Sequence, residues 1–512
     1  MKKAIKRPLA LAAALCISGS ACAASPAEAL PAPAGETLVQ TDFVISTFHC
    51  VPGGLTPEYP QLLTLAKEAG LTHVETTFTA PSASQTVLDI AEQIGLKVIV
   101  QDYTRFGGFQ NWPDRIAATT EDSAKEAVEM FDSPALAGYY IWDEPFLEQF
   151  EQVRQDIGIM DRLDPGKIQL VTMLQSYSPD YTWDNGMYKT YLDRYMAEVR
   201  PPLLVFDYYV FDHDVDKGVG LYDSAMWKDM GYIRLKAKEA DIPYWFYIQL
   251  IGDIPNNTPG TMTVPRVAVQ DYISLAFGVS GISYYNAIEG IFDDKGNKNH
   301  LYDGVAALNR DILTLGRALL GAESTLVYHT SPLQHDDYLD QLGDSETVEA
   351  APADLFIGEF NAPDGGQYLL PVNTDYEKER SGSIRLKASK TVYRIDKATG
   401  QPVLVAESTD AIDYQMAAGE GELYWLTDLP SDPPPVVPTG DQPAASEPDS
   451  PAETGGSESG IPSTGTEPGA SPPIGLIAAL VLGGAVLLGG AGIVCAYLYR
   501  RKTMNKRKEP PQ

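Results

Sequence analysis

The chain has 512 residues, which is more than one domain of ordinary size, and we therefore expect several parts. Its 69 acidic and 38 basic side chains give a formal net charge of −31, which argues against nucleic acid or an anionic lipid surface as a partner. Of the four cysteines, only Cys50 lies outside the apolar segments near the two termini, so we expect no internal disulfide.

Residues 1–23 predict a secretory signal peptide. Four basic residues precede the apolar run 9–17, and Ala21-Cys22-Ala23 supplies a small-residue cleavage pattern. The rest of the chain is therefore expected outside the cytoplasm. Without the leader and the basic C-terminal tail, residues 24–499 keep 28 basic and 68 acidic side chains, a net charge of −40.

Residues 38–322 alternate short apolar runs with segments that carry apolar residues at helical spacing. Glycines such as Gly70, Gly95 and Gly166 stand where helices are expected to end. Eight strand–helix units predict the α/β class and a (β/α)8 TIM barrel, with a doubly wound open sheet as the alternative. The eight predicted strands are 43–47, 72–78, 97–103, 138–142, 167–174, 203–209, 243–250 and 281–285.

Residues 323–428 differ in character, because short β-rich runs separated by turn residues replace the alternation. We expect a small antiparallel β-sandwich domain here. Residues 429–473 are rich in proline, serine, glycine and acidic residues, which is typical of an extended, disordered stalk.

The apolar segment 474–499 contains no charged residue and exceeds the roughly 20 residues that a membrane-spanning helix needs. Six basic residues in the tail 500–512 follow it, which predicts a cytoplasmic C-terminus and an external bulk. Ile461-Pro462-Ser463-Thr464-Gly465, followed by this span and tail, resembles the cell-wall sorting signal of Gram-positive surface proteins, whose usual pentapeptide is LPxTG, although Ile replaces the leading Leu. The resemblance implies sortase cleavage after Thr464 and attachment to peptidoglycan, and an ordinary membrane anchor is the alternative.

Polar and aromatic residues follow the ends of the predicted barrel strands, which meet at one face of a TIM barrel. The fourth strand ends most abruptly, because Tyr140-Ile141-Trp142 gives way to Asp143-Glu144 and Pro145, and proline lacks the N–H that a strand needs. In chain order the strand ends supply His49; Glu75; Asp102 and Tyr103; Asp143 and Glu144; Gln175 and Tyr177; Asp207, Tyr208 and Tyr209; Gln249; and Tyr285 and Asn286, with Glu289 just beyond.

Carboxylates, amides and aromatic rings together are the set that sugars require, since hydroxyls need polar partners and pyranose faces pack on rings. Cleavage of a glycosidic bond needs two carboxyl groups that flank it. A carboxylic acid beside Trp142 and Tyr140 would have its charged form disfavoured, which suits a general acid.

Trp142-Asp143-Glu144-Pro145 resembles the Asn-Glu-Pro at strand four of retaining barrel glycoside hydrolases of clan A. The resemblance implies that Glu144 is the acid/base and that Asp143 takes the place of the asparagine. That superfamily carries its nucleophilic glutamate at the end of strand seven, where this chain has Gln249. An amide cannot replace a carboxylate nucleophile.

The second carboxylate is therefore expected from another strand, with Asp207 first, followed by Glu289, Asp102 or Glu75. An inverting mechanism and assistance by the substrate's own acetamido group are the alternatives.

The sequence thus predicts a glycoside hydrolase at the extracellular face of the cell envelope, anchored to membrane or wall, with Glu144 and Asp207 catalytic and an oligo- or polysaccharide substrate. No cofactor or metal is expected. One alternative is a non-catalytic carbohydrate-binding surface protein on a degenerate barrel, and another is a barrel enzyme with a different polar substrate. The expected substrate contacts are His49, Asp102, Asp143, Tyr208, Tyr209, Gln249, Tyr285 and Asn286.

Overall fold

A computed structural model describes residues 38, 40–109, 119–178, 180–211, 221–252, 262–363 and 365–428. The predicted signal peptide, stalk, sorting motif, membrane span and tail lie outside these ranges. Among the helices within them, none combines the length and apolar character needed to cross a membrane.

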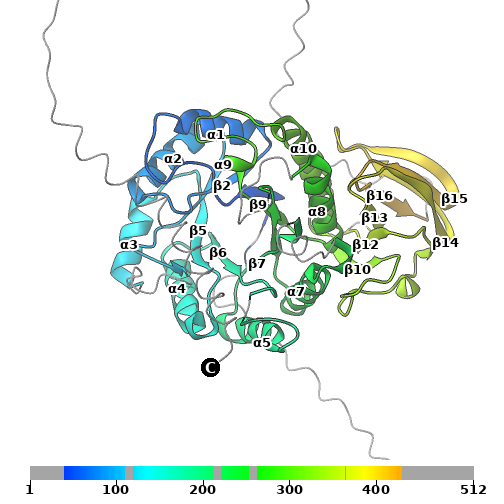
Figure 1. The fold of residues 1–512 in the computed structure, drawn as a ribbon, viewed down its shortest axis with the longest axis horizontal. Helices are drawn as coiled ribbons and strands as arrows, with labels where there is room; N and C mark the ends of the chain where they lie inside the picture. The colour runs from blue at the N-terminus through cyan, green and yellow to red at the C-terminus, as the bar shows by residue number, and fades with distance from the viewer. Residues whose placement is uncertain are drawn as a thin grey trace, which may run out of the picture.

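Eight parallel strands surround a central axis (Figure 1). They are paired in the order β1-β9-β8-β7-β6-β5-β3-β2. The Thr72 N–H donates to the Ile45 carbonyl at 2.9 Å and joins the two ends of this order, so the sheet closes as a barrel rather than an open doubly wound sheet. The strands are β1 (Val44–Thr47), β2 (His73–Glu75), β3 (Lys97–Val100), β5 (Leu136–Asp143), β6 (Ile168–Met173), β7 (Leu204–Asp207), β8 (Tyr244–Gln249) and β9 (Gly281–Tyr285), and a short β4 (Gly108–Phe109) pairs with β5.

Each predicted barrel strand is present, and helices follow them to form an outer ring (Figure 1). Gly70, Gly95 and Gly166 take positive φ angles after helices, as expected from the sequence. The helices are α1 (Tyr59–Glu68), α2 (Pro81–Ile94), α3 (Glu121–Met130), α4 (Phe150–Leu163), α5 (Met187–Arg194), α7 (Met226–Ala240), α8 (Val264–Phe277), α9 (Ala287–Gly290) and α10 (Tyr302–Leu319), with short helical turns η2 (Leu147–Gln149), η3 (Tyr195–Val199), η4 (Leu221–Asp223) and η5 (Leu342–Asp344).

The barrel strands are apolar along their whole length because both faces are buried. On β5, Tyr139 and Ile141 pack outward in the core shared with the helices, whereas Tyr140 packs in a separate inner core. Trp245 and Tyr247 of β8 belong to the same inner core. The barrel interior is therefore filled with side chains below the polar mouth.

The region after α10 forms one antiparallel sheet, where the sequence predicts a two-sheet sandwich. Its long strands β14 and β15 pair with three register shifts, and such irregularities bend and twist a strand. The sheet carries its own apolar cluster, which includes Ile357, Leu369 and Ile384. The strands are β10 (Glu323–His329), β11 (Val348–Ala350), β12 (Leu355–Asn361), β13 (Gln367–Asn373), β14 (Arg380–Ile395), β15 (Pro402–Met416) and β16 (Tyr424–Thr427).

The other face of this sheet packs against α8 of the barrel (Figure 1). Gly358 of β12 marks the closest approach, because a Cβ added there would lie 2.3 Å from the Ala276 carbonyl oxygen. Phe356 stacks on Phe277 with ring centroids 5.0 Å apart. Barrel and sheet therefore share one continuous core.

Candidate active site at the barrel mouth

Glu144 and Asp207 meet at the carboxyl ends of β5 and β7. Gln175, which follows β6 between them, donates from its Nε2 to Glu144 Oε1 at 2.5 Å and also to Asp207 Oδ1. Two hydrogen bonds of about 2.9 Å to one nitrogen limit the two acceptors to a separation of roughly 6 Å. The two carboxyl groups predicted from separate strands are thus held as a pair.

Glu144 sits in an unusual backbone conformation just past the end of β5. Its φ is +47°, which a residue other than glycine rarely adopts, and its N–H donates to the Thr172 carbonyl at 2.8 Å. Pro145 prevents further pairing of the strand. Glu144 is partly exposed, whereas Asp143 and Asp207 beside it are buried.

Asp207 is a buried carboxyl group beside another acid. Burial raises the pKa of Asp207 well above its usual range, and the charge of Glu144 raises it further. Hydrogen bonds from Gln175 and from Tyr209 act in the opposite direction, because they stabilise the charged form. The charge of Glu144 therefore disfavours ionisation of Asp207 at the same time.

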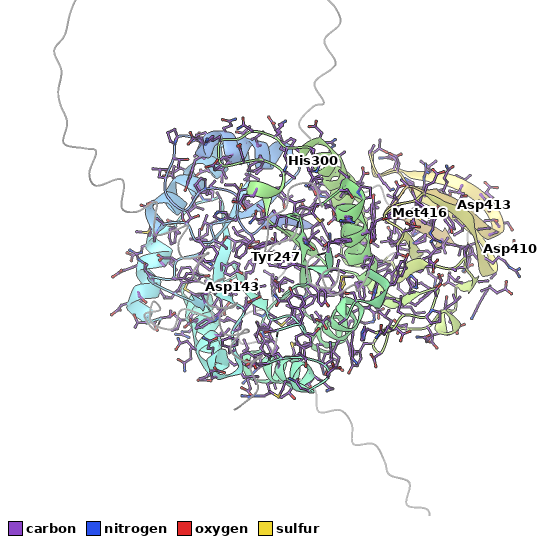
Figure 2. The ribbon with its side chains drawn as sticks, viewed as in Figure 1. Asp143, Tyr247, His300, Asp410, Asp413 and Met416 are labelled. Atoms are coloured by element: carbon purple, nitrogen blue, oxygen red, sulfur yellow. The ribbon has the colours of Figure 1, made fainter. Side chains whose placement is uncertain are left out.

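Asp143 points into the barrel, near the centre of the ring of strands (Figure 2). Its Oδ1 accepts a hydrogen bond from the Tyr140 hydroxyl at 2.9 Å, and that hydroxyl also bonds to Thr172 Oγ1 at 2.7 Å. Burial first, and then the charge of Glu144, raise the pKa of Asp143 well above its usual range. Asp143 thus adds a third, hydrogen-bonded carboxyl group to the site.

Glu75 lies deeper, where hydroxyl groups surround it. Ser46 and Ser283 donate to Oε1 at 2.9 and 2.7 Å, and Tyr247 donates to Oε2 at 2.5 Å. Burial raises the pKa of Glu75 to about 6 against these hydrogen bonds. Both carboxylate oxygens are occupied, which makes Glu75 a buried polar support for the barrel interior rather than a partner of Glu144.

Asp102, another candidate for the second carboxylate and for substrate contact, is paired locally. Its Oδ2 accepts from the Arg105 guanidinium at 2.8 Å, and its Oδ1 accepts from the Thr104 hydroxyl at 2.5 Å and the Thr104 N–H at 3.0 Å. The Asp102 side chain is fully buried by these contacts. Glu289, by contrast, is exposed in the short segment α9 after β9.

Gln249 has both ends of its amide bonded to backbone. Its Oε1 accepts from the Phe211 N–H at 2.9 Å, and its Nε2 donates to the Ile251 carbonyl at 3.2 Å. Its side chain therefore connects the loops after β7 and β8. The structure thus places Gln249 in backbone contacts, where a contact with substrate was expected.

Tyr208 and Tyr209 diverge, because successive residues point to opposite sides of an extended chain. Tyr208 packs against Phe206 and Tyr177 in the outer core, contrary to the predicted substrate contact. Tyr209 turns inward, hydrogen-bonds to Asp207 and packs on Tyr285 at a centroid distance of 5.1 Å. Tyr209 and Tyr285 therefore lie at the predicted face.

His49 and Asn286 lie at the rim beside β1 and β9. His49 Nδ1 pairs with the Thr77 carbonyl at 3.1 Å, and burial lowers the pKa of the ring. The Oδ1 atom of Asn286 is buried and has no hydrogen-bond partner among the described residues, so it offers an acceptor. In the ranges that the structure describes, no three His, Cys, Asp or Glu side chains are arranged to hold a metal ion.

Two aromatic residues near the mouth, Phe48 and Phe78, were not among the predicted site residues. Phe48 packs against Tyr140, Tyr247 and Tyr285 at centroid distances of 5.9, 6.1 and 5.4 Å. Phe78 extends this aromatic group, at 5.8 Å from Phe48. Gln175 was expected at the end of its strand, but its role as a bridge was not predicted, because that role depends on two other strands.

No protein-family model matches the chain. No curated protein matches it either. Among solved structures, a glycoside hydrolase family 5 protein from Bacteroides vulgatus is similar, with 13% identity, a TM-score of 0.48 and coverage of 76% of this chain and 90% of that one. Alpha-galactosidase I from Mortierella vinacea is also similar, with 10% identity, a TM-score of 0.45 and coverage of 76% of this chain and 96% of that one. A GH27 β-L-arabinopyranosidase from Geobacillus stearothermophilus has 9% identity, a TM-score of 0.45 and coverage of 77% of this chain and 97% of that one.

Proposed function

We propose that the barrel is a glycoside hydrolase in which Glu144 is the acid/base and Asp207 the nucleophile. The observation that carries this proposal is the Gln175 side chain, whose one amide nitrogen donates to both carboxylates. A retaining enzyme needs its two carboxyl groups about 5–5.5 Å apart, and an inverting enzyme needs about 6.5–9.5 Å. The limit of roughly 6 Å set by a shared donor supports the retaining arrangement.

The roles follow from the environments of the two groups. Glu144 is the more exposed and carries the proton that it gives to the glycosidic oxygen as the bond to the leaving sugar breaks. Burial raises the pKa of Asp207 most, but with Glu144 neutral the second cause, the charge of Glu144, is removed, and the hydrogen bonds from Gln175 and Tyr209 lower this pKa and favour the carboxylate. That carboxylate attacks the anomeric carbon and forms a glycosyl ester.

The second step restores the enzyme. Glu144, now a carboxylate, takes a proton from water as the water oxygen attacks the anomeric carbon and releases Asp207. Two inversions give a sugar with the configuration of the substrate. Tyr209, Tyr285 and Phe78 supply ring surfaces for pyranose faces at the mouth.

We further propose that the enzyme works outside the cell, held at the envelope through residues 429–512. This part of the proposal rests on the leader-like residues 1–23, the apolar segment 474–499 and the basic tail. A stalk rich in proline would hold the barrel away from the envelope.

The test is hydrolysis of a panel of glycans and aryl glycosides by the full-length chain, beside Glu144→Gln and the control Glu148→Gln. Glu148 is an exposed acid four residues away. Turnover that the first substitution abolishes and the second leaves intact would support the proposal. No turnover on a broad panel, with glycan binding retained, would instead favour the carbohydrate-binding protein.

A further inference from the structure

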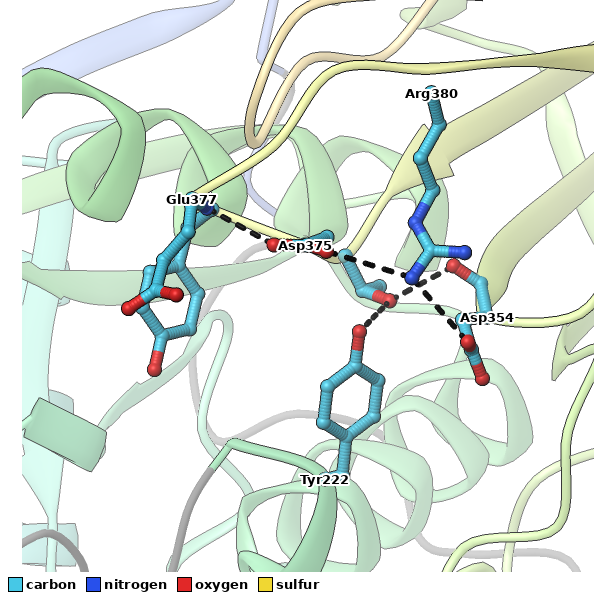
Figure 3. A pocket seen from close by; sticks show the side chains of 7 residues that line it. Tyr222, Asp354, Asp375, Glu377 and Arg380 are labelled. Carbon is cyan, nitrogen blue, oxygen red and sulfur yellow. Dashed lines mark hydrogen bonds and ion pairs between the residues drawn. The ribbon is translucent and has the colours of Figure 1, made fainter.

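A pocket of about 450 Å³ opens between the barrel and the antiparallel sheet (Figure 3). Its volume falls within the roughly 300–1,000 Å³ of small-molecule sites. Its walls come from both parts of the chain, with Tyr222 from η4 of the barrel and Asp354, Asp375, Tyr376, Glu377 and Arg380 from the sheet.

The pocket adjoins the barrel face that carries the catalytic pair. Tyr376 packs edge-on against Phe211, at a centroid distance of 5.2 Å, and Phe211 is four residues beyond Asp207. The Arg266 guanidinium lies over both rings, at 5.2 Å from Phe211 and 5.4 Å from Tyr376. The Phe211 N–H bonds to Gln249, so the wall between pocket and mouth is tied to the end of β8.

Arg380 is the central charged group of the pocket (Figure 3). Its Nη2 donates to Asp354 at 3.2 Å and to Asp375 at 3.5 Å. Its Nε is buried and has no hydrogen-bond partner among the described residues. Nη1 donates to the Ala353 carbonyl at 3.4 Å, and together with the ion pairs this bond holds the guanidinium and both carboxylates in place.

The walls favour a neutral ligand that carries many hydroxyl groups. Asp354, Asp375 and Glu377 against Arg380 give the lining a formal charge of −2, which disfavours phosphate, sulfate and uronic acids. Asp354 and Asp375 already accept from Arg380, and also from the Ser331 hydroxyl and the backbone N–H groups of Glu377 and Lys378, respectively. The exposed Glu377 carboxylate is therefore the main acceptor for ligand hydroxyls. The rings of Tyr222 and Tyr376 offer surfaces for the apolar face of a sugar.

We propose that this pocket is a second carbohydrate site, which binds a neutral sugar unit beside the catalytic pair. The ligand class rests on the proposed function, because the bound unit would belong to the same glycan that the barrel cleaves. The site would hold one part of a polymeric substrate while another part occupies the mouth.

The test uses the full-length chain with Asp207→Asn, which prevents turnover. The probes are neutral gluco-, galacto-, manno- and xylo-oligosaccharides and their uronate-bearing counterparts, screened on an array and followed by titration calorimetry with the tightest neutral binder. Arg380→Gln and Glu377→Ala are the variants. Arg385→Gln is the control, because Arg385 is also on β14 but pairs with Glu349 at the exposed surface.

We expect each pocket variant to weaken one binding event at least tenfold, the control to change it less than twofold, and the uronates to bind more weakly. Arg380→Gln leaves two carboxylates unpaired and can unfold the loop, but Glu377 is exposed and its loss spares the ion pairs. Binding that Glu377→Ala and Arg380→Gln leave unchanged, or no bound neutral glycan, would overturn this inference. Hydrolysis by the unmodified chain is measured separately. Hydrolysis without binding at the pocket would overturn this inference alone, and binding at the pocket without hydrolysis would overturn the proposed function alone.

Discussion

Glu144 and Asp207, 63 positions apart in the chain, accept hydrogen bonds from the same side-chain nitrogen of Gln175. Three consecutive barrel strands, β5, β6 and β7, each supply one member of this arrangement. A neutral donor between two acids keeps their bonded oxygens close together.

Glu144→Gln should lower kcat about 10²–10⁴-fold, because a positioned general acid contributes that much and an amide cannot give up a proton. The effect should be smallest for aryl glycosides with good leaving groups, which need little protonation. Steady-state kinetics on two aryl glycosides that differ in leaving-group pKa measure this. Glu148→Gln changes an exposed neighbouring acid and should leave kcat unchanged. An equal loss of kcat in both variants would contradict the role of Glu144 as general acid.

Hydrolysis should retain the anomeric configuration, because the shared donor limits the two bonded oxygens of Glu144 and Asp207 to roughly 6 Å, which favours the shorter separation of retaining enzymes. Proton NMR of the first-formed product reads the anomer directly. Asp207→Ala should be inactive and recover turnover with added azide, yielding the glycosyl azide of opposite configuration. An inverted first product from the unmodified enzyme would contradict the assignment of Asp207 as nucleophile.

Gln175→Met should keep the shape of the side chain while removing the donor to both acids. Since that hydrogen bond lowers the pKa of Asp207, its loss should raise the pKa further and move the acid limb of the kcat/KM profile to higher pH. Gln169→Met is a matched control, because the amide atoms of Gln169 are buried on β6, the strand that precedes Gln175, without hydrogen-bond partners among the described residues. An unshifted profile would argue that Gln175 only fills space.

Glu75→Gln should change how stability depends on pH. The pKa of Glu75 is raised from 4.5 to about 6 in the fold, so its stabilising effect is complete below 4.5 and is lost as pH rises through about 6. That shift corresponds to about 2 kcal/mol of unfolding free energy. Urea unfolding at pH 4 and pH 8 should show the stability of the unmodified chain falling by about this much relative to the variant. A difference that is the same at both pH values would contradict the prediction.

Gly358→Ala should destabilise the contact between the sheet and α8. The added Cβ would lie 2.3 Å from the Ala276 carbonyl oxygen, and such overpacking costs about 1–3 kcal/mol. Chemical denaturation followed by tryptophan fluorescence measures the change. Gly343→Ala meets nothing within 4 Å and provides the control, so a similar loss in both would point away from this contact.

Sequence periodicity predicted the barrel well, because strands buried on both faces appear as continuous apolar runs at regular spacing. The antiparallel region after α10 was equally visible. The arrangement of its strands in one sheet could not be predicted, because the register shifts within β14 and β15 depend on partners distant in the chain.

At the site, the residues that end the strands can be identified from the sequence, and Asp143-Glu144-Pro145 stands out without any structure. Which of these residues meet depends on the three-dimensional fold. Asp102 pairs with Arg105, Gln249 bonds to backbone and Tyr208 packs outward, while Gln175 joins Glu144 to Asp207. The physical reason is that a strand end brings a side chain to the barrel mouth, whereas its direction and hydrogen-bond partner depend on neighbouring strands and on the loop that follows.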